Sequence, residues 1–170
     1  MTKKKKKART RQRPEPEDTV AAAQAAAVRL LARREYSRGE LEQRLRGRGF
    51  GRERVTEVLD ALEAEGYLSD ARFAEHFVRS RIERGNGPMK IRAELSQRGV
   101  ADAEVERALD AAECDFAALA ASVRARRFGE AGPRDLPDKA RQARFLAQRG
   151  FRSEDMRGCL DLDPADPGFE

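Results

Sequence analysis

One spacing of leucine, glycine and an apolar residue recurs four times along the chain and constrains its fold more than any other feature. Each leucine is followed four residues later by glycine, and the next residue is Phe, Tyr or Val. The glycines are Gly49, Gly66, Gly99 and Gly150. This spacing is typical of a Schellman motif, in which a left-handed glycine ends a helix and the following residue packs back on the leucine. The pattern predicts a chain of short helices.

A second pattern repeats about every 50 residues. Apolar side chains form an i, i+3, i+4, i+7 stripe at Val55, Val58, Leu59 and Leu62, again at Val105, Ala108, Leu109 and Ala112, and in part at Met156, Cys159 and Leu160. Such a stripe indicates one buried helix face, and its recurrence indicates tandem units. We expect an all-α fold, an elongated array of three tandem three-helix, helix-turn-helix-like repeats at residues 20–69, 70–113 and 114–162.

Local signals place the helices within the first two repeats. The first helix is expected from Val20 to about Tyr36, and Ser37 with Glu40 fits a capping box that begins the second. In the middle repeat we expect helices over residues 70–84 and 89–98, separated by the sequence Gly-Asn-Gly-Pro. The third repeat has a longer connection, residues 129–137, before its middle helix.

Charge is distributed unevenly along the chain. The net charge is +5, but residues 1–13 contain eight of the 35 Lys and Arg residues and no acid. We expect residues 1–19 to form a disordered basic tail, which either binds nucleic acid weakly and without specificity or only aids solubility. Residues 163–170 are expected to form an acidic C-terminal tail.

Several classes of function lack support in the sequence. No apolar run approaches the roughly 20 residues of a membrane span, and Cys114 and Cys159 have no metal or disulfide spacing. His76 is the only histidine and is expected at the surface, while residues 85–90 lack the spacing of a phosphate loop. We therefore expect a cytoplasmic, monomeric protein that is not an enzyme and has no cofactor, metal or catalytic site.

Basic residues gather in the middle and third repeats. They are either ordinary solvated helix faces or, as a group, a surface for a long acidic or polyanionic partner, to which arginine binds well through its planar fork. The candidates are Arg72, Arg79, Arg81, Arg84, Lys90, Arg92, Arg98, Arg124, Arg126, Arg127, Arg141, Arg144 and Arg149.

The middle repeat also resembles a known family. Residues 73–100 read FAEHFVRSRIERGNGPMKIRAELSQRGV, which is similar to the signature of the RecX family, and the resemblance extends over residues 30–160. It implies a regulator of the RecA recombinase that binds RecA and RecA-coated single-stranded DNA and blocks filament extension. It also implies roles in homologous recombination, DNA repair and the SOS response.

Two other readings remain beside the resemblance. Three-helix units also occur in helix-turn-helix proteins that bind specific DNA sequences. The third helices, residues 52–65 and 102–113, are acidic or balanced in charge, which opposes contact with phosphates. A generic helical scaffold would explain the repeat but not the motif in the middle unit.

Overall fold

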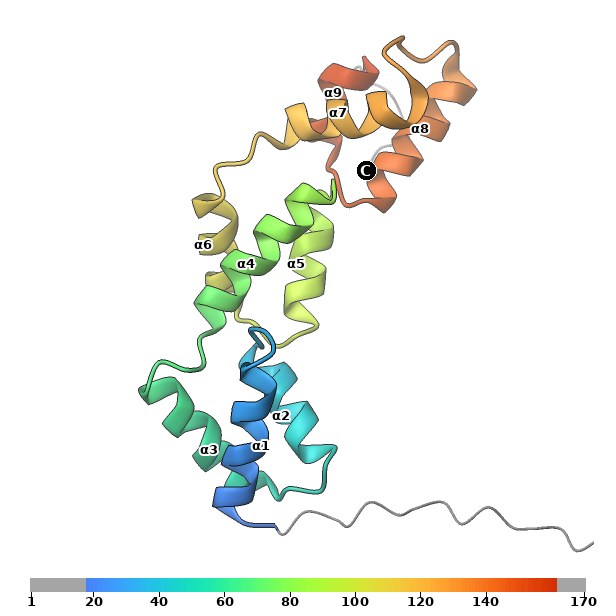
Figure 1. Ribbon diagram of the computed structural model, residues 1–170. Coiled ribbons are helices and arrows are strands. Elements are labelled where there is room, and N and C mark those ends of the chain that lie inside the picture. Colours follow the sequence, from blue (N-terminus) through green and yellow to red (C-terminus); the bar gives the residue numbers. More distant parts are fainter. Residues whose placement is uncertain (1–17, 162–170) are drawn as a thin grey trace, which may run out of the picture.

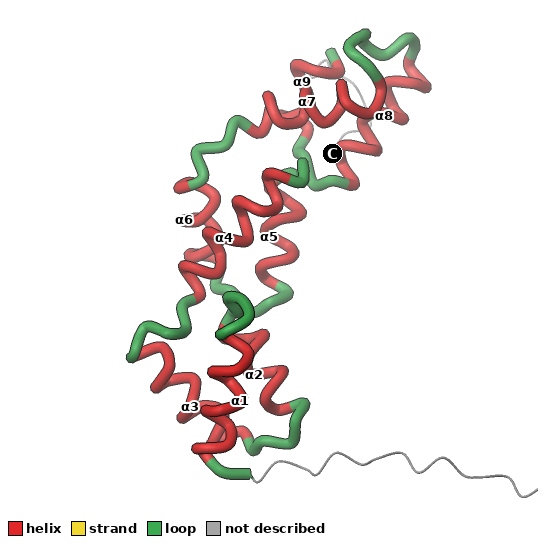
Figure 2. Tube along the Cα trace, viewed as in Figure 1, coloured by secondary structure: helices red, strands yellow, loops and turns green. Residues whose placement is uncertain are grey.

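The computed structural model describes residues 18–161 of the chain. Within this range the protein contains nine helices and no strand (Figure 2). The helices are α1 (Val20–Leu31), α2 (Arg38–Arg46), α3 (Arg52–Ala64), α4 (Asp70–Glu83), α5 (Pro88–Ser96), α6 (Asp102–Ala111), α7 (Phe116–Phe128), α8 (Leu136–Gln148) and α9 (Ser153–Leu160). The predicted all-α class is confirmed. Of the predicted tails, residues 1–17 and 163–170 lie outside the described residues, whereas Thr19 is the cap residue of α1.

The nine helices form three three-helix repeats that are stacked into one elongated, curved column (Figure 1). Repeat 1 consists of α1–α3, repeat 2 of α4–α6 and repeat 3 of α7–α9. Each repeat has its own apolar core, which contains Leu41 and Leu45 in the first, Ile91 and Leu95 in the second and Leu146 in the third. The predicted array of tandem repeats is confirmed.

The glycine motifs end helices as predicted. At all four positions φ lies between 75° and 95°, the left-handed region that glycine adopts without strain. The amide after each glycine donates to the carbonyl of the leucine five residues earlier, as in Val100 to Leu95 at 3.2 Å. The motif after α3 differs in one respect. Tyr67 is 63% exposed, and Leu68, 2% exposed, packs into the core in its place.

The beginning of α2 departs from the prediction in two ways. α1 ends at Leu31 instead of near Tyr36, because Tyr36 is buried in the core of repeat 1 ahead of the extended cap residue Ser37. Ser37 Oγ accepts a hydrogen bond from the Glu40 amide at 3.1 Å, so half of the capping box forms. The Glu40 carboxylate instead contacts Arg34 and Arg98.

The middle helices of the three repeats meet end to end. Ser37 Oγ at the start of α2 donates to the Arg98 carbonyl at the end of α5, at 2.7 Å. The amides of Gly87 and Met89 at the start of α5 donate to the carbonyls of Arg149 and Gly150, at 2.8 and 3.0 Å. A helix start has unsatisfied N–H groups and a helix end has unsatisfied carbonyls, so each junction satisfies both. The resulting row runs from α8 through α5 to α2 (Figure 1).

The row of middle helices ends at the start of α8. There the Asp135 carboxylate accepts from the Asp138 amide at 2.8 Å, so the helix is capped by its own residue. The preceding loop is fixed from α7 by Arg124, whose guanidinium donates to Gln142 Oε1 at 2.9 Å and to the Ala131 carbonyl. Arg124 is only 5% exposed, so it serves the interior of repeat 3.

Candidate interaction surface

The structure separates the thirteen predicted basic residues by what they contact. Five form ion pairs with a carboxylate of another side chain: Arg72 with Glu35, Arg81 with Glu94, Arg92 with Glu106, Arg98 with Glu40 and Arg141 with Asp138. With Arg124, which is buried, they are committed to contacts within the protein. Their predicted role toward a partner stays a prediction.

Two of these arginines connect repeats 1 and 2. Arg72 on α4 reaches Glu35 at 2.7 Å, and Arg98 at the end of α5 reaches Glu40 at 3.4 Å. A third pair, Arg92 and Glu106, fastens α5 to α6 through two hydrogen bonds of 2.6 and 2.7 Å. Those bonds lower the pKa of Glu106, because they favour its ionised form. The ion pairs of repeat 2 are therefore largely structural.

Of the other seven candidates, Arg149 is half-buried and donates to backbone carbonyls, and six exposed residues form no ion pair with any residue in the range 18–161. They are exposed cations on α4, α5, α7 and α8 and in the turn after α4: Arg79, Arg84, Lys90, Arg126, Arg127 and Arg144. Their charges are not neutralised by neighbouring carboxylates in this part of the chain. A cation of this kind keeps its electrostatic potential for a partner.

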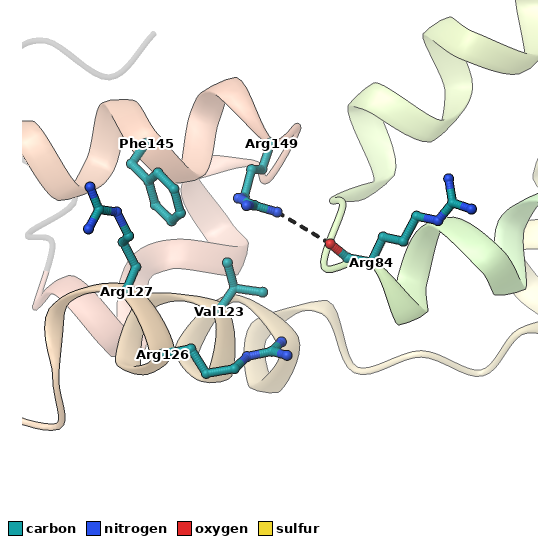
Figure 3. Close-up of a pocket in the computed structure, with 6 residues that line it drawn as sticks. All are labelled: Arg84, Val123, Arg126, Arg127, Phe145 and Arg149. Atoms are coloured by element: carbon teal, nitrogen blue, oxygen red, sulfur yellow. Dashed lines mark hydrogen bonds between the residues drawn. The ribbon is translucent and has the colours of Figure 1, made fainter.

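Part of this free charge lies at the junction of repeats 2 and 3. A solvent-open hollow of about 280 Å³ is lined there by Arg84, Val123, Arg126, Arg127, Phe145 and Arg149 (Figure 3). None of the six lining residues is acidic. The hollow thus brings one residue of repeat 2 together with five of repeat 3, which lie about 40 to 65 positions further along the chain.

The backbone of the junction positions the hollow. The Arg149 guanidinium donates to the carbonyls of Arg84 and Gly85, at 3.3 and 3.4 Å, and lies 5.0 Å from the centre of the Phe145 ring. Gly85, with φ of 71°, turns the chain after α4. A Cβ placed on Gly85 would lie 2.6 Å from Val123, so only glycine allows this approach.

The side chains take different directions around the hollow. Arg127 and Arg149 lie on either side of the Phe145 ring (Figure 3). Arg126 lies on the side of Val123 that is away from this ring (Figure 3). Arg84 contributes its carbonyl to the hollow, whereas its guanidinium points away toward repeat 2 (Figure 3). The hollow therefore has two guanidinium groups of repeat 3, those of Arg127 and Arg149, beside one aromatic ring, while the Arg126 guanidinium lies farther away (Figure 3).

The sequence did not indicate Phe145 as part of a surface. Its neighbours Arg144 and Arg149 were candidates, but no local pattern shows that this ring faces the turn after α4. Arg79, Lys90 and Arg144 do not line the hollow. The basic positions of repeats 2 and 3 are thus only partly brought together.

No feature of an enzyme or metal site appears among residues 18–161. His76 is exposed, and no group of three or more His, Cys, Asp or Glu residues in this range could hold a metal ion. Burial raises the pKa of both the Cys114 and Cys159 thiols, which disfavours the nucleophilic thiolate. Within the same range, none of the helices has the length and apolarity that crossing a bilayer requires.

The chain matches known proteins over its three repeats. Sequence models of the first, second and third three-helix domains of RecX match residues 23–62, 69–109 and 113–160, in that order. A protein named Regulatory protein RecX from Halorhodospira halophila is 52% identical over 138 residues, which cover 81% of this chain and 86% of the relative. Its namesake from Chromohalobacter salexigens is 53% identical over 134 residues, covering 79% and 88%.

Solved structures share the fold. The crystal structure of RecX from Lactobacillus salivarius superposes with a TM-score of 0.71 at 23% identity and covers 85% of this chain and 97% of its own. A second crystal structure of regulatory protein RecX gives 0.73 at 22% identity, over 84% and 73%. At this identity the likeness concerns the fold, while the domain matches and the relatives concern the family. The chain therefore belongs to the RecX family of regulatory proteins.

Proposed function

We propose that this protein is a non-enzymatic, monomeric, cytoplasmic regulator that binds RecA and RecA-coated single-stranded DNA. By binding along the filament it inhibits filament extension, ATPase activity and strand exchange, and so modulates homologous recombination and DNA repair. The observation that carries the proposal is the set of unneutralised cations on repeats 2 and 3 of an elongated column in a chain of the RecX family.

The shape and the charge both suit a filament. Three repeats joined end to end can contact successive subunits of a long partner, which one compact domain of 50 residues cannot do. The free side chains of Arg79, Lys90 and Arg144 extend the positive charge beyond the hollow. Electrostatic complementarity of this kind mainly raises the association rate and selects the partner.

A helix-turn-helix repressor is a weaker candidate. The exposed face of α3 includes Glu53, Glu57, Asp60 and Glu63, and that of α6 includes Asp102, Glu106 and Asp110. These carboxylates would meet the phosphates of a duplex if either helix entered the major groove. The six free candidate cations lie instead on, or directly after, the first and middle helices of repeats 2 and 3.

The test is a direct measurement on RecA. Purified RecA is passed over the immobilised protein, and RecA filament extension on single-stranded DNA is followed with and without the protein, together with ATP hydrolysis. We expect retention of RecA and a halt in extension at substoichiometric to equimolar protein. Unchanged extension and ATP hydrolysis at stoichiometric excess would contradict the proposal.

A further inference from the structure

We propose that the hollow between repeats 2 and 3 is a phosphate-binding site whose ligand is the backbone of a single nucleic acid strand. This inference rests on the proposed function, because it assigns one part of the proposed contact surface to nucleic acid and leaves the rest of that surface for RecA. Its binding step can be measured without RecA.

The first support is the chemistry of the lining. Arg126, Arg127 and Arg149 surround the hollow and none of its six lining residues is acidic. Arg126 and Arg127 are exposed and unpaired with any carboxylate of residues 18–161. Arginine pairs with phosphate oxygens through two parallel N–H donors, so it suits a ligand with several charged oxygens.

The second support is the preorganisation of Arg149. Its guanidinium is fixed by the carbonyls of Arg84 and Gly85 and by the Phe145 ring, so little side-chain freedom remains to be lost on binding. Carbonyl groups satisfy only some of its five donors. The remaining N–H groups are available to an anion at the edge of the hollow.

The third support is the spacing of the cations. Arg127 and Arg149 lie on opposite sides of the Phe145 ring, and Arg126 lies beyond Val123 (Figure 3). The ring itself packs against Arg149, 5.0 Å from its centre, and against Phe128, 5.3 Å away. A nucleic acid strand carries one phosphate on every nucleotide, so successive phosphates can meet cations that are separated in this way.

Occupancy of the hollow also has a mechanical consequence. The ligand contacts Arg126 and Arg127 of repeat 3 and lies against the turn at Arg84 and Gly85 of repeat 2. It therefore bridges the two repeats across the junction at which Gly87 and Met89 donate to α8. Binding is expected to slow hydrogen exchange of the Gly87 and Met89 amides.

The experiment uses the full chain and a fluorescent oligothymidylate. Binding is measured by anisotropy over a range of salt for the wild type, for Arg126→Gln/Arg127→Gln, and for the control Arg29→Gln/Arg33→Gln. The control removes two exposed arginines of repeat 1, Arg29 on α1 and Arg33 in the turn after it, and leaves the basic N-terminus unchanged. Inorganic tripolyphosphate and polyglutamate of matched charge serve as competitors, and circular dichroism confirms the fold of each variant.

The expected result is a loss of affinity of about tenfold in the Arg126/Arg127 variant and a salt slope lower by about 1.4, the value for two phosphate contacts on a single strand. The control should stay within about twofold of the wild type. Phe145→Leu, which keeps an apolar side chain, should weaken strand binding about fivefold, because the ring no longer holds the Arg149 guanidinium in place. The slowed exchange at Gly87 and Met89 should appear in the wild type and in the control, and should be reduced in the Arg126/Arg127 variant at the same strand concentration.

Several results would overturn the inference. If the strand leaves exchange at Gly87 and Met89 unchanged and the two double variants bind equally well, the hollow is not a nucleic acid site. If polyglutamate displaces the strand as well as tripolyphosphate does, the hollow recognises carboxylates and a protein is its partner. If tripolyphosphate protects the junction and the strand does not, the site is one for free phosphates. None of these results affects inhibition of RecA, which is measured separately.

Discussion

The two junctions between repeats achieve the same end-to-end arrangement of middle helices by different means. Between repeats 1 and 2, side chains make the contacts: Ser37 reaches the Arg98 carbonyl, and the ion pairs Arg72–Glu35 and Arg98–Glu40 flank it. Between repeats 2 and 3, each hydrogen bond uses a backbone carbonyl: the amides of Gly87 and Met89 donate to the end of α8, and the Arg149 guanidinium donates to the carbonyls of Arg84 and Gly85. A junction built from backbone leaves arginines unpaired, whereas a junction built from ion pairs neutralises them.

The two junctions also differ in how their arginines are used. The first junction uses its arginines to hold repeats together, and the second has free arginines around the hollow next to it. We infer that repeats 2 and 3 carry the contact surface and that repeat 1 extends it. The following predictions test this contrast, beginning with the largest expected effect.

Replacement of Gly87 by alanine should open the second junction. Its Cβ would lie 2.4 Å from the carbonyl carbon and oxygen of Gly150, which are backbone atoms that cannot move independently. We expect a loss of about 3 kcal/mol in the free energy of unfolding, from overpacking and a lost hydrogen bond. Urea denaturation measures it. Gly132→Ala, where the new Cβ meets nothing within 4 Å, is the control, and equal stability of the two variants would refute the close contact.

Ser37→Ala should weaken the first junction by a smaller amount. The hydroxyl is fully buried, caps α2 and donates to Arg98, so its loss should cost about 1–2 kcal/mol. Thr19→Ala removes a comparable cap from α1, at an exposed site without a contact between repeats, and should cost about 0.5–1 kcal/mol. Thermal denaturation measures both variants. A larger loss of stability for Thr19→Ala than for Ser37→Ala would contradict the role of Ser37 in joining repeats 1 and 2.

Salt should loosen the first junction more than the second. Glu35→Gln with Glu40→Gln removes the flanking ion pairs, which are partly exposed, so we expect a loss below about 1 kcal/mol that vanishes at high salt. Hydrogen exchange in the residues around Ser37 and Asp70 should rise with salt in the wild type, while the amides of Gly87 and Met89 should change little. The opposite order would show that the two junctions had been assigned incorrectly.

The smallest effect concerns pH at the first junction. Asp70 accepts a hydrogen bond from the Arg38 amide at 2.7 Å, and its burial raises the pKa of its carboxyl. Because the pKa of Asp70 is higher in the folded than in the unfolded state, its contribution to the free energy of unfolding is complete below the usual carboxyl pKa. That contribution is lost as the pH rises through the folded pKa. Asp70→Asn keeps the acceptor, so it should match the wild type at low pH and become more stable than it as the pH rises.

A control separates the effect of Asp70 from that of any carboxylate at a helix start. Asp102 begins α6 as Asp70 begins α4, but it is exposed. Chemical denaturation at several pH values measures Asp102→Asn beside Asp70→Asn, so that a gain with rising pH can be assigned to the buried carboxyl. A variant at Asp70 that loses stability relative to the wild type as the pH rises would contradict the assignment.

The sequence predicts the local part of this fold well and the junctions poorly. A Schellman motif is encoded within six residues, so Leu95, Gly99 and Val100 suffice to place the end of α5. The contact of Ser37 with Arg98 joins residues 61 positions apart, and no periodic pattern in the sequence indicates it. The early end of α1 has the same origin, because burial of Tyr36 in the assembled repeat outweighs the helical propensity of the residues before it.

The candidate site could be predicted only as a set of basic segments. Arg79 and Arg81 are equivalent in the sequence, yet Arg81 is paired with Glu94 on the next helix and Arg79 is free. Which cation is neutralised depends on how two helices pack, and which cations meet depends on how two repeats stack. Phe145 gave no signal, because its role arises from the turn at Gly85 in the neighbouring repeat.

The most direct test of the contrast between the repeats measures inhibition of RecA filament extension by two matched variants. One carries Arg84→Gln, Arg126→Gln and Arg127→Gln at the second junction, and the other carries Arg29→Gln, Arg33→Gln and Arg52→Gln, which are exposed residues of repeat 1. Both lose three charges. We predict that the first variant fails to halt extension at concentrations at which the wild type and the second variant succeed. Equal inhibition by both variants, or loss in the second alone, would contradict the account.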